Sequence, residues 1–390
     1  PYYHHCMKPT LLLITKDAPT PDRRKAGLFP VAIRHHLSLD AKVLLYAIDD
    51  GLGQNASEVS GLPGVIYLNA KMRSPSRLAA TLKRREGKAR TRQLIAAARK
   101  YGVSATIGLQ SAPQSGYLGQ YVARAIDCPV ASWEHLSTYS RFDAQLNERL
   151  LNSFFRNANA VAAVSTPTLK AIERRFNLSL RNAMTIPNPV PDDFEALPPP
   201  SPNRYASQSN GYFTFGAWTN WRDIKRLDIL LEAFKRVASH RPMTKLIIAG
   251  PMSDASQKEI ESHPASGQIV KLGNISRQDI HHLAHAIDCC CLTSDYETFG
   301  LPVVEALAAG RPVISTRTDG PSEILSSQPM LGQLVPKGDI EAFALAMITA
   351  VDAASYVDAA KLRQYAIAMY GEAAQVSRWR NLYRSVGLLV

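Results

Sequence analysis

Two glutamates lie close together in the stretch ETFGLPVVEALAAGRPVIS. Glu297 and Glu305 are separated by seven residues, and a helix is predicted from Pro302 onward, because proline at the first helical position has a suitable φ and lacks only an N–H that would be unpaired. A carboxylate can accept hydrogen bonds from two vicinal hydroxyls, as on a ribose. The helix dipole alone also favours acidic residues near a helix start, so the neighbouring residues must decide between these interpretations.

The residues just before this helix favour an anion-binding site. Phe299, Gly300 and Leu301 contribute N–H groups that have no partner within a helix and face whatever lies in front of it. Glu297 and Glu305 suit hydroxyls rather than phosphate. Hydroxyls, a diphosphate and further hydroxyls occur in that order in a nucleotide sugar, which is the ligand that this stretch predicts.

Apolar runs alternate with helical patterns along the whole chain. The runs begin at Leu11, Val43, Ala105, Pro129, Ala160 and Met184 in the first half, and at Tyr212, Lys245, Ile269, Cys289 and Pro312 in the second. This rhythm is typical of βα units and of parallel sheets covered on both faces. The proline-rich residues 187–211 separate the two series and indicate a linker. Two Rossmann-like domains in tandem are therefore predicted, with ligands at the carboxyl ends of the strands.

Residues 294–325, SDYETFGLPVVEALAAGRPVISTRTDGPSEIL, resemble the central signature of the family four retaining glycosyltransferases of GT-B fold. The motif of that family is a Glu, seven residues and a second Glu. Further segments agree in order and spacing: KRLDILLEAF from Lys225, IVKLGNISRQDI from Ile269, QLVPKGDIEAFA from Gln333, AVAAVS from Ala160, IPNPV from Ile186 and WEHLSTYS from Trp133. The likeness covers most of the chain and is most specific in the second half.

The resemblance implies an α/β fold of GT-B type, in which two tandem Rossmann-like domains face a central cleft. An N-terminal, acceptor-side domain is predicted over 7–190, and a nucleotide-sugar-binding domain over 191–373. The C-terminal helix, 374–390, is expected to pack back on the first domain through its aromatic residues. Residues 1–6 precede the first Met and stand outside this prediction.

The resemblance also implies a role for each matching residue of the second half. Glu305 would hold the ribose of the donor, and Glu297 would contact the hydroxyls of the donor sugar. The N–H groups of residues 299–301 would bind the diphosphate, and Lys225 would neutralise it. Without the motif, Lys225 at a helix start is as readily a solvated charge.

Two further residues are carried over to the first domain, and two departures from the family pattern stand out. His135 would lie across the cleft beside the donor sugar, although in isolation it suits a packed core histidine. Gly27 would lie in a loop close to the phosphates, where the family has a glycine pair. Family members usually carry an Arg directly after Gly216, where this chain has Ala217, and Arg222 is the predicted substitute.

The implied reaction is sugar transfer with retention of configuration. Cleavage of the bond to the diphosphate places negative charge on the departing oxygen, and donors aimed at that oxygen stabilise the transition state. The family resemblance suggests a same-face displacement in which the leaving phosphate helps to deprotonate the acceptor. Glu297 and His135 are the predicted catalytic residues, and they would orient the sugar without attacking it.

Metal binding is not predicted. No Asp-x-Asp pair accompanies the expected diphosphate site, so its charge is assigned to Lys225, Arg222 and the helix end. Three adjacent cysteines, 289–291, alternate sides on a strand and cannot converge on one ion, which favours a buried strand. His281 and His285 have ligand-like spacing but lack a fitting set of partners on that helix face. No cofactor is implied, and the UDP- or GDP-sugar is a substrate.

The net charge of +12 is concentrated in the first half. Residues 1–190 carry 26 Lys+Arg against 12 Asp+Glu, and residues 71–100 alone carry 11 basic residues and one acidic residue. With Leu78, Leu82, Leu94 and Ile95 as an apolar stripe, residues 71–100 are predicted to dock on anionic lipid, with a solvated helix as the alternative. No nucleic-acid recognition module accompanies the charge.

Few cysteines and the absence of a long apolar run favour a cytoplasmic enzyme, peripheral on the inner face of the membrane. The apolar run from Leu11, LLLI followed by Thr15, is too short for the hydrophobic region of a signal peptide. The predicted activity is transfer of a hexose-type sugar to a glycan or lipid-linked acceptor in bacterial cell-surface polysaccharide or glycolipid assembly. A nucleotide-sugar-binding protein that has lost transfer stays open as the alternative. A Rossmann oxidoreductase is disfavoured, because no Gly-x-Gly-x-x-Gly follows the first strand.

Overall fold

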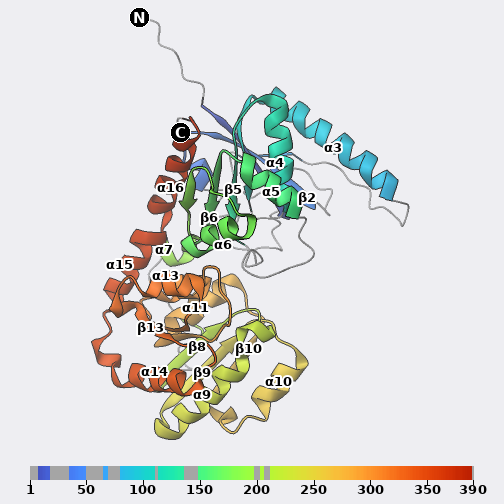
Figure 1. The fold of residues 1–390 in the computed structure, drawn as a ribbon. Helices are drawn as coiled ribbons and strands as arrows, with labels where there is room; N and C mark the ends of the chain where they lie inside the picture. The colour runs from blue at the N-terminus through green and yellow to red at the C-terminus, as the bar shows by residue number, and fades with distance from the viewer. Residues whose placement is uncertain are drawn as a thin grey trace, which may run out of the picture. The chain divides into compact units, whose positions relative to one another are not determined.

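A computed structural model of the 390-residue chain describes residues 8–17, 35–49, 65–68, 80–109, 113–135, 148–196, 203–205 and 211–388. The chain divides into two compact units (Figure 1). Unit 1 comprises Pro1–Pro187 and Gln375–Val390, and unit 2 comprises Asn188–Ala374. The sequence prediction placed the domains at 7–190 and 191–373 and the returning C-terminal helix at 374–390, whereas the compact units divide after Pro187 and after Ala374.

Unit 1 is built on a parallel sheet of seven strands in the order β3-β2-β1-β4-β5-β6-β7. The strands are β1 (Thr10–Asp17), β2 (Lys42–Asp49), β3 (Val65–Leu68), β4 (Val103–Leu109), β5 (Val130–Glu134), β6 (Ala160–Ala163) and β7 (Ala183–Thr185). Each apolar run predicted in this half is a strand, and β3 was missed because VIYL is short. The inner strands carry continuous apolar runs because both of their faces are covered.

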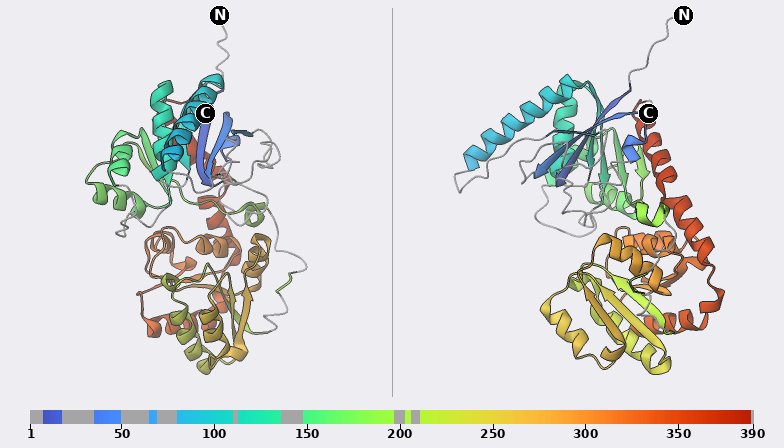
Figure 2. Two further views of the ribbon diagram at one scale, coloured as in Figure 1. Left: turned by 90° about the vertical axis from the view of Figure 1, so that its right-hand side faces the viewer. Right: turned by 180° about the vertical axis from the view of Figure 1, so that it is seen from behind.

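Helices from both ends of the chain cover this sheet (Figure 2). They are α3 (Ala80–Lys100), α4 (Pro113–Ile126), α5 (Glu148–Asn157), α6 (Thr166–Phe176) and α16 (Glu372–Ser385). In α16, Trp379 and Tyr383 are buried, and the Trp379 ring lies 4.3 Å from that of His36 and 5.3 Å from that of Trp133. Aromatic residues of the C-terminal helix therefore pack within unit 1.

The basic helix α3 uses its C-terminal half for packing. Leu94 is 3% exposed and belongs to a core cluster with Leu12 and Leu44, so its assignment to a membrane-facing stripe is wrong. Residues 71–79 and the side chain of Leu82 lie outside what the structure describes. Within the described part of the chain, no helix combines the length and apolar character needed to span a membrane.

Unit 2 is built on a second parallel sheet with the order β10-β9-β8-β11-β12-β13. Its strands are β8 (Phe213–Trp218), β9 (Thr244–Ala249), β10 (Ile269–Gly273), β11 (Cys289–Leu292), β12 (Val313–Thr316) and β13 (Gly332–Val335). This is the strand order of the Rossmann fold, and the prediction of Rossmann-like sheets is confirmed. The three cysteines of β11 are buried, as predicted for a core strand, whereas β13 was missed.

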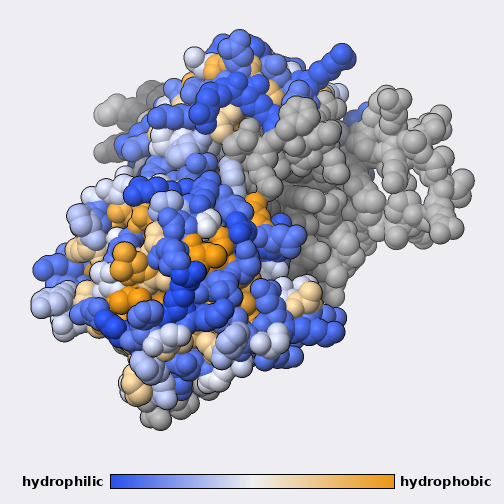
Figure 3. All heavy atoms as spheres, turned by 60° about the horizontal axis from the view of Figure 1, so that its bottom comes forward, coloured by the Kyte–Doolittle hydropathy of each residue, from blue (hydrophilic) through white to orange (hydrophobic). Residues whose placement is uncertain are grey.

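Helices flank both faces of the second sheet (Figure 1). They are α7 (Asp192–Ala196), α9 (Leu227–His240), α10 (Asp254–Glu261), α11 (Arg277–Ala286), α12 (Leu301–Ala308), α13 (Asp319–Leu325), α14 (Ile340–Asp352) and α15 (Ala359–Tyr370). The apolar face of α9 packs with α14 and the strands around Phe215, Phe234 and Phe343. On the surface that Figure 3 brings forward, apolar residues of unit 2 lie in groups among polar ones.

Candidate functional site

The predicted donor residues of unit 2 follow two neighbouring strands. β8 ends at Trp218 and leads into a loop that carries Lys225, and β11 ends at Leu292 and leads into a loop that carries Glu297. The two strands pair directly, and the strand order reverses between them. Their loops therefore meet at the switch point of the sheet, where parallel sheets of this kind bind ligands.

Lys225 and Glu297 form an ion pair at this point. The Lys225 Nζ lies 2.5 Å from Glu297 Oε1, and the two side chains are 12% and 14% exposed. Ser294 Oγ donates a second hydrogen bond to the same oxygen at 2.9 Å. Glu297 Oε2 has no recorded partner among the described residues, so one carboxylate oxygen remains for a ligand.

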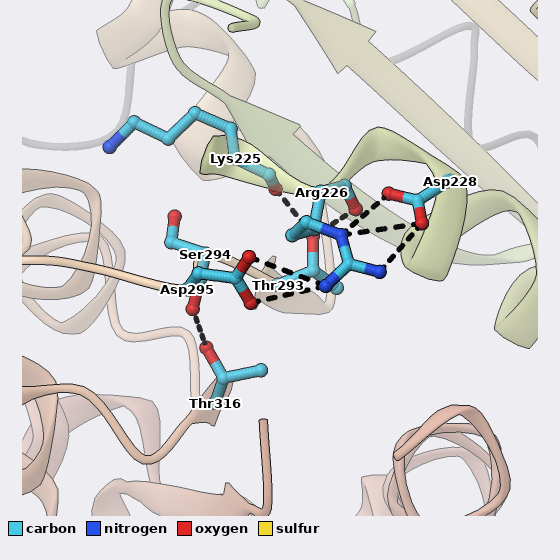
Figure 4. Close-up of polar contacts among 7 residues, drawn as sticks. All are labelled: Lys225, Arg226, Asp228, Thr293, Ser294, Asp295 and Thr316. Carbon is cyan, nitrogen blue, oxygen red and sulfur yellow. Dashed lines mark hydrogen bonds and ion pairs between the residues drawn. The ribbon is translucent and has the colours of Figure 1, made fainter. Parts of the chain in front are cut away.

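Arg226 fixes the loop that carries Lys225. Its backbone is in the left-handed region, with φ at +52°, a conformation that costs free energy for a residue other than glycine. Its guanidinium donates to Asp228 Oδ2 at 2.8 Å and to Asp295 Oδ1 at 3.2 Å (Figure 4). The hydrogen bond from Arg226 lowers the pKa of Asp228. In Figure 4 the Lys225 side chain extends away from this cluster, which leaves its amine for Glu297.

Two threonines connect the same loops through the backbone. Thr293 Oγ1 lies 2.9 Å from the carbonyl oxygens of Lys225 and Arg226. Thr316 Oγ1, at the end of β12, donates to the carbonyl oxygen of Ser294 at 2.5 Å (Figure 4). The Lys225 and Glu297 loops are thus tied to each other and to the neighbouring strand, so the ion pair rests on a fixed frame.

Glu305 occupies a different environment in the second turn of α12. Its side chain is 1% exposed. The Trp218 indole N–H donates to Glu305 Oε2 at 2.6 Å, and Arg277 Nη1 lies 2.5 Å from Oε1. Sequence reasoning missed both partners, although Trp218 lies next to the discussed Ala217 and Arg277 lies within the matched segment from Ile269.

The start of α12, where an anion site is predicted, differs from the prediction in one respect. The helix begins at Leu301, so Pro302 occupies its second position, and Gly300 is the N-cap with φ at +83°. Within the described residues, no recorded backbone hydrogen bond uses the N–H of Phe299, Gly300 or Leu301. Gly320 allows α13 to approach this loop, since a Cβ there would lie 2.2 Å from Phe299 Cα.

Residue 217, where the family usually has an arginine, and its predicted substitute Arg222 lie in different surroundings. Ala217 is buried in β8, and the side chain of Arg222 is exposed and has no recorded polar partner in the described part of the chain. Arg222 is the N-cap of the 3-10 turn Asp223–Lys225, so it lies in the loop that carries Lys225, and only its backbone has recorded hydrogen bonds there. Arg277, entering from the start of α11, is the guanidinium that contacts Glu305.

In unit 1, His135 directly follows β5. Its ring lies 4.2 Å from that of Trp133 in an edge-on arrangement, and the Trp133 indole N–H donates to the carbonyl oxygen of Ile186 at 2.7 Å. Burial lowers the pKa of His135 to about 3, so the imidazole is neutral at physiological pH. Gly27 lies outside the described residues.

The histidines of α11 serve packing. His281 and His282 are buried, and the rings of His281 and His285 lie 4.8 Å and 6.0 Å from that of Phe194. Burial lowers the pKa of His285 to about 4. No group of three or more potential metal ligands occurs in the described residues.

Comparison with known proteins agrees with this geometry. Residues 213–369 match the family model described as glycosyl transferases group 1. The chain resembles a family four glycosyltransferase. It is 23% identical over 285 residues to a phosphatidyl-myo-inositol mannosyltransferase of Mycolicibacterium smegmatis, a match that covers 71% of each chain. The family match and this relative support the interpretation of the chain as a glycosyltransferase.

The fold is shared with solved glycosyltransferases. A glycosyltransferase from Rickettsia africae superposes with a TM-score of 0.77 at 17% identity, covering 97% of this chain and 99% of that one. HepE of Anabaena, solved in complex with UDP, superposes with a TM-score of 0.72 at 17% identity, covering 96% of this chain and 100% of that one. The protein therefore has the GT-B fold, with two Rossmann-like halves.

Proposed function

We propose that the protein is a retaining, metal-independent glycosyltransferase that moves a hexose-type sugar from a UDP- or GDP-sugar to an acceptor. The observation that carries this proposal is the Lys225–Glu297 pair, 2.5 Å apart, just before the start of α12, where the N–H groups of residues 299–301 have no recorded backbone hydrogen bond within the described residues. Glu305, further along the same helix, marks the ribose end of the site. The family match of this unit supports the same interpretation.

Donor binding redistributes the charges of this pair. A diphosphate at the start of α12 attracts the Lys225 amine more strongly than the single charge of Glu297 does, so the amine moves to the phosphate oxygens. Glu297 then offers its oxygens to hydroxyls of the donor sugar. Lys225 and the N–H groups of residues 299–301 stabilise charge on the departing oxygen, which grows in the transition state.

The same-face displacement needs no covalent nucleophile. Glu297 orients the sugar ring, and the departing phosphate oxygen takes the proton of the acceptor hydroxyl. His135 acts in its neutral form, because burial lowers its pKa to about 3, so it can accept or donate a hydrogen bond to a sugar hydroxyl without carrying charge. The phosphate charge is met by Lys225, the helix start and Arg222.

The acceptor is proposed to be a glycan or a lipid-linked molecule in bacterial cell-surface glycolipid or polysaccharide assembly. The mannosyltransferase of Mycolicibacterium smegmatis, which is named for phosphatidyl-myo-inositol, supports a glycolipid. Peripheral docking from the cytoplasm onto anionic lipid would use the basic residues of 71–100 other than the face of Leu94. Vesicle co-sedimentation at low and high salt tests docking, and wild-type protein that stays in the supernatant at low salt would favour a soluble acceptor.

A non-transferring nucleotide-sugar-binding protein is the second candidate, and the buried Ala217 in place of the family arginine favours it. Release of free sugar and nucleotide from a UDP- or GDP-sugar without acceptor distinguishes the two. The enzyme is expected to hydrolyse its donor slowly, and a Glu297→Gln variant is the matched control. Tight donor binding with no hydrolysis and no transfer to any lipid or glycan extract would establish the second candidate.

A further inference from the structure

A cavity of about 490 Å³ lies within unit 2, at the amino ends of the strands. Its lining includes the first residues of β8, β11, β12 and β13. The loops that carry Lys225 and Glu297 follow the carboxyl ends of β8 and β11, so the cavity and the proposed donor site lie at opposite ends of the same strands. The volume is typical of a pocket for a small molecule.

Arg311 lines this cavity and keeps part of its bonding capacity unused. Its Nη2 donates to the carbonyl oxygen of His285 at 2.9 Å, and its Nε is buried without a hydrogen-bond partner in the described residues. Its Nη1 has no recorded partner there either and is not among the buried unpaired atoms, so it is accessible. Burial lowers the pKa of Arg311, because a cation removed from water without a paired anion is unfavourable. This guanidinium is suited to receive an anionic group.

Asp288 contributes the opposite charge to the same lining. It directly precedes β11, and Arg311 lies two residues before β12, the strand that pairs with β11. Its Oδ2 accepts a hydrogen bond from the Thr214 N–H at 2.8 Å, and its Oδ1 has no recorded partner within the described chain. The Asp288 charge acts to raise the pKa of Arg311, yet no ion pair is recorded between them. The two groups are near enough to influence each other and too far apart to pair.

The rest of the lining is mostly apolar. Its other two charged residues, Lys361 and Asp358, neutralise each other across 3.0 Å, which leaves neither for a ligand. Met330 and Val357 are 40% and 38% exposed, whereas Leu362 is buried. Large apolar side chains left accessible around a cavity are typical of a binding surface. The ligand that fits has two opposite charges and an apolar part.

We propose that this cavity binds a small zwitterion with an apolar body, of which an α-amino acid with an apolar side chain is the simplest. The carboxylate accepts a hydrogen bond from Arg311, and the ammonium group donates to Asp288. The apolar part packs against Met330 and Val357. Both charged groups of the ligand are therefore needed for binding, and the site acts independently of the nucleotide donor.

The test uses calorimetric titration of the full chain at pH 7 with L-leucine, L-methionine and L-phenylalanine. The amino acid that binds most tightly is then compared with its two truncated analogues, the acid that lacks the ammonium group and the amine that lacks the carboxylate. Each analogue is expected to bind wild type about tenfold more weakly, as for the loss of one hydrogen bond between charged groups. UDP and GDP should not compete with the amino acid.

Two variants assign the two ends of the ligand. Arg311→Met should bind the amino acid and the amine equally, because the partner of the carboxylate is gone. Asp288→Asn, which keeps an oxygen for the Thr214 N–H, should bind the amino acid and the acid equally. Lys361→Met is the matched control, since Lys361 lines the same cavity but is already paired with Asp358. It should keep both wild-type preferences.

The crossed pattern distinguishes recognition in this cavity from general damage, because each variant loses one preference and keeps the other. Circular dichroism establishes that each variant is folded. The inference is wrong if wild type binds none of the three amino acids, if both truncated analogues bind as tightly as the amino acid, or if the folded Arg311→Met and Asp288→Asn variants keep both preferences. Direct competition by UDP or GDP would also overturn it, because the ligand would then occupy the donor site.

Discussion

The two glutamates of the site have the same chemistry but different surroundings. Glu297 is 14% exposed, pairs with the amine of Lys225 and keeps one oxygen without a partner in the part of the chain that the structure describes. Glu305 is 1% exposed and is held between Trp218 and Arg277. The long, flexible lysine can exchange its partner when a ligand arrives, whereas the planar guanidinium and the indole hold a fixed geometry. One carboxylate is therefore suited to contact the reacting sugar, and the other to shape the site.

The largest effect is expected from removing the buried carboxylate. Glu305→Ala leaves Arg277 as an uncompensated buried charge, so the free energy of unfolding should fall by about 3–5 kcal/mol. Chemical denaturation followed by circular dichroism measures this difference. Glu305→Gln keeps an oxygen that can accept the hydrogen bond from Trp218, so its free energy of unfolding should fall by less. Wild-type stability in Glu305→Ala would contradict the buried pairing.

Removing the accessible carboxylate should affect turnover instead. Glu297→Gln is expected to lower kcat for sugar transfer by about 100-fold, because the donor sugar is no longer held in its reactive orientation. The KM for the donor should change little, since ribose and diphosphate contacts stay in place. Steady-state kinetics with a radiolabelled donor measures both. A variant with normal kcat and a strongly raised KM would assign Glu297 to ground-state binding.

Loss of the exchangeable cation should mainly weaken donor binding. Lys225→Met is expected to lower the affinity for the nucleotide sugar by about tenfold, since a hydrogen bond between charged groups is lost. The variant Lys235→Met, on an exposed part of α9, is the control and should bind as wild type does. Equal affinity of Lys225→Met and wild type, measured by calorimetry, would mean that Lys225 does not leave Glu297 for the diphosphate.

Chelation should have the smallest effect. Transfer activity is expected to survive excess EDTA, because Lys225, Arg222 and the helix start are assigned to the phosphate charge. The comparison is made with fresh protein before and after dialysis against the chelator. Complete loss of activity that magnesium or manganese restores would show that a metal ion does this work.

The sequence predicted the sheets well because parallel strands covered on both faces carry continuous apolar runs. The short edge strands β3 and β13 escaped detection, since VIYL and GQLV offer too few residues for a pattern. The membrane-facing stripe of α3 was predicted too broadly, because a helix sequence does not show which leucine meets the core. Leu94 does so in the structure.

The sequence predicted the motif residues of the site but not the residues that contact them. Glu297, Glu305 and Lys225 lie in motifs that spacing and family resemblance reveal. The sequence does not reveal their partners: Arg277 follows β10 and the helix of Glu305 follows β11, so the two residues meet only once these strands are placed in one sheet. The left-handed backbone of Arg226 likewise has no sequence signal, since glycine is the residue that this conformation favours.

The most direct test of the account is a calorimetric titration of the full chain with UDP-, GDP- and ADP-sugars in the presence of EDTA. The account predicts that a UDP- or GDP-sugar binds at one site per chain and that Glu305→Ala, if folded, binds it more weakly. Absence of binding by wild type to all of these donors, or equal binding by wild type and folded Glu305→Ala, would contradict the assignment of this site to a nucleotide sugar.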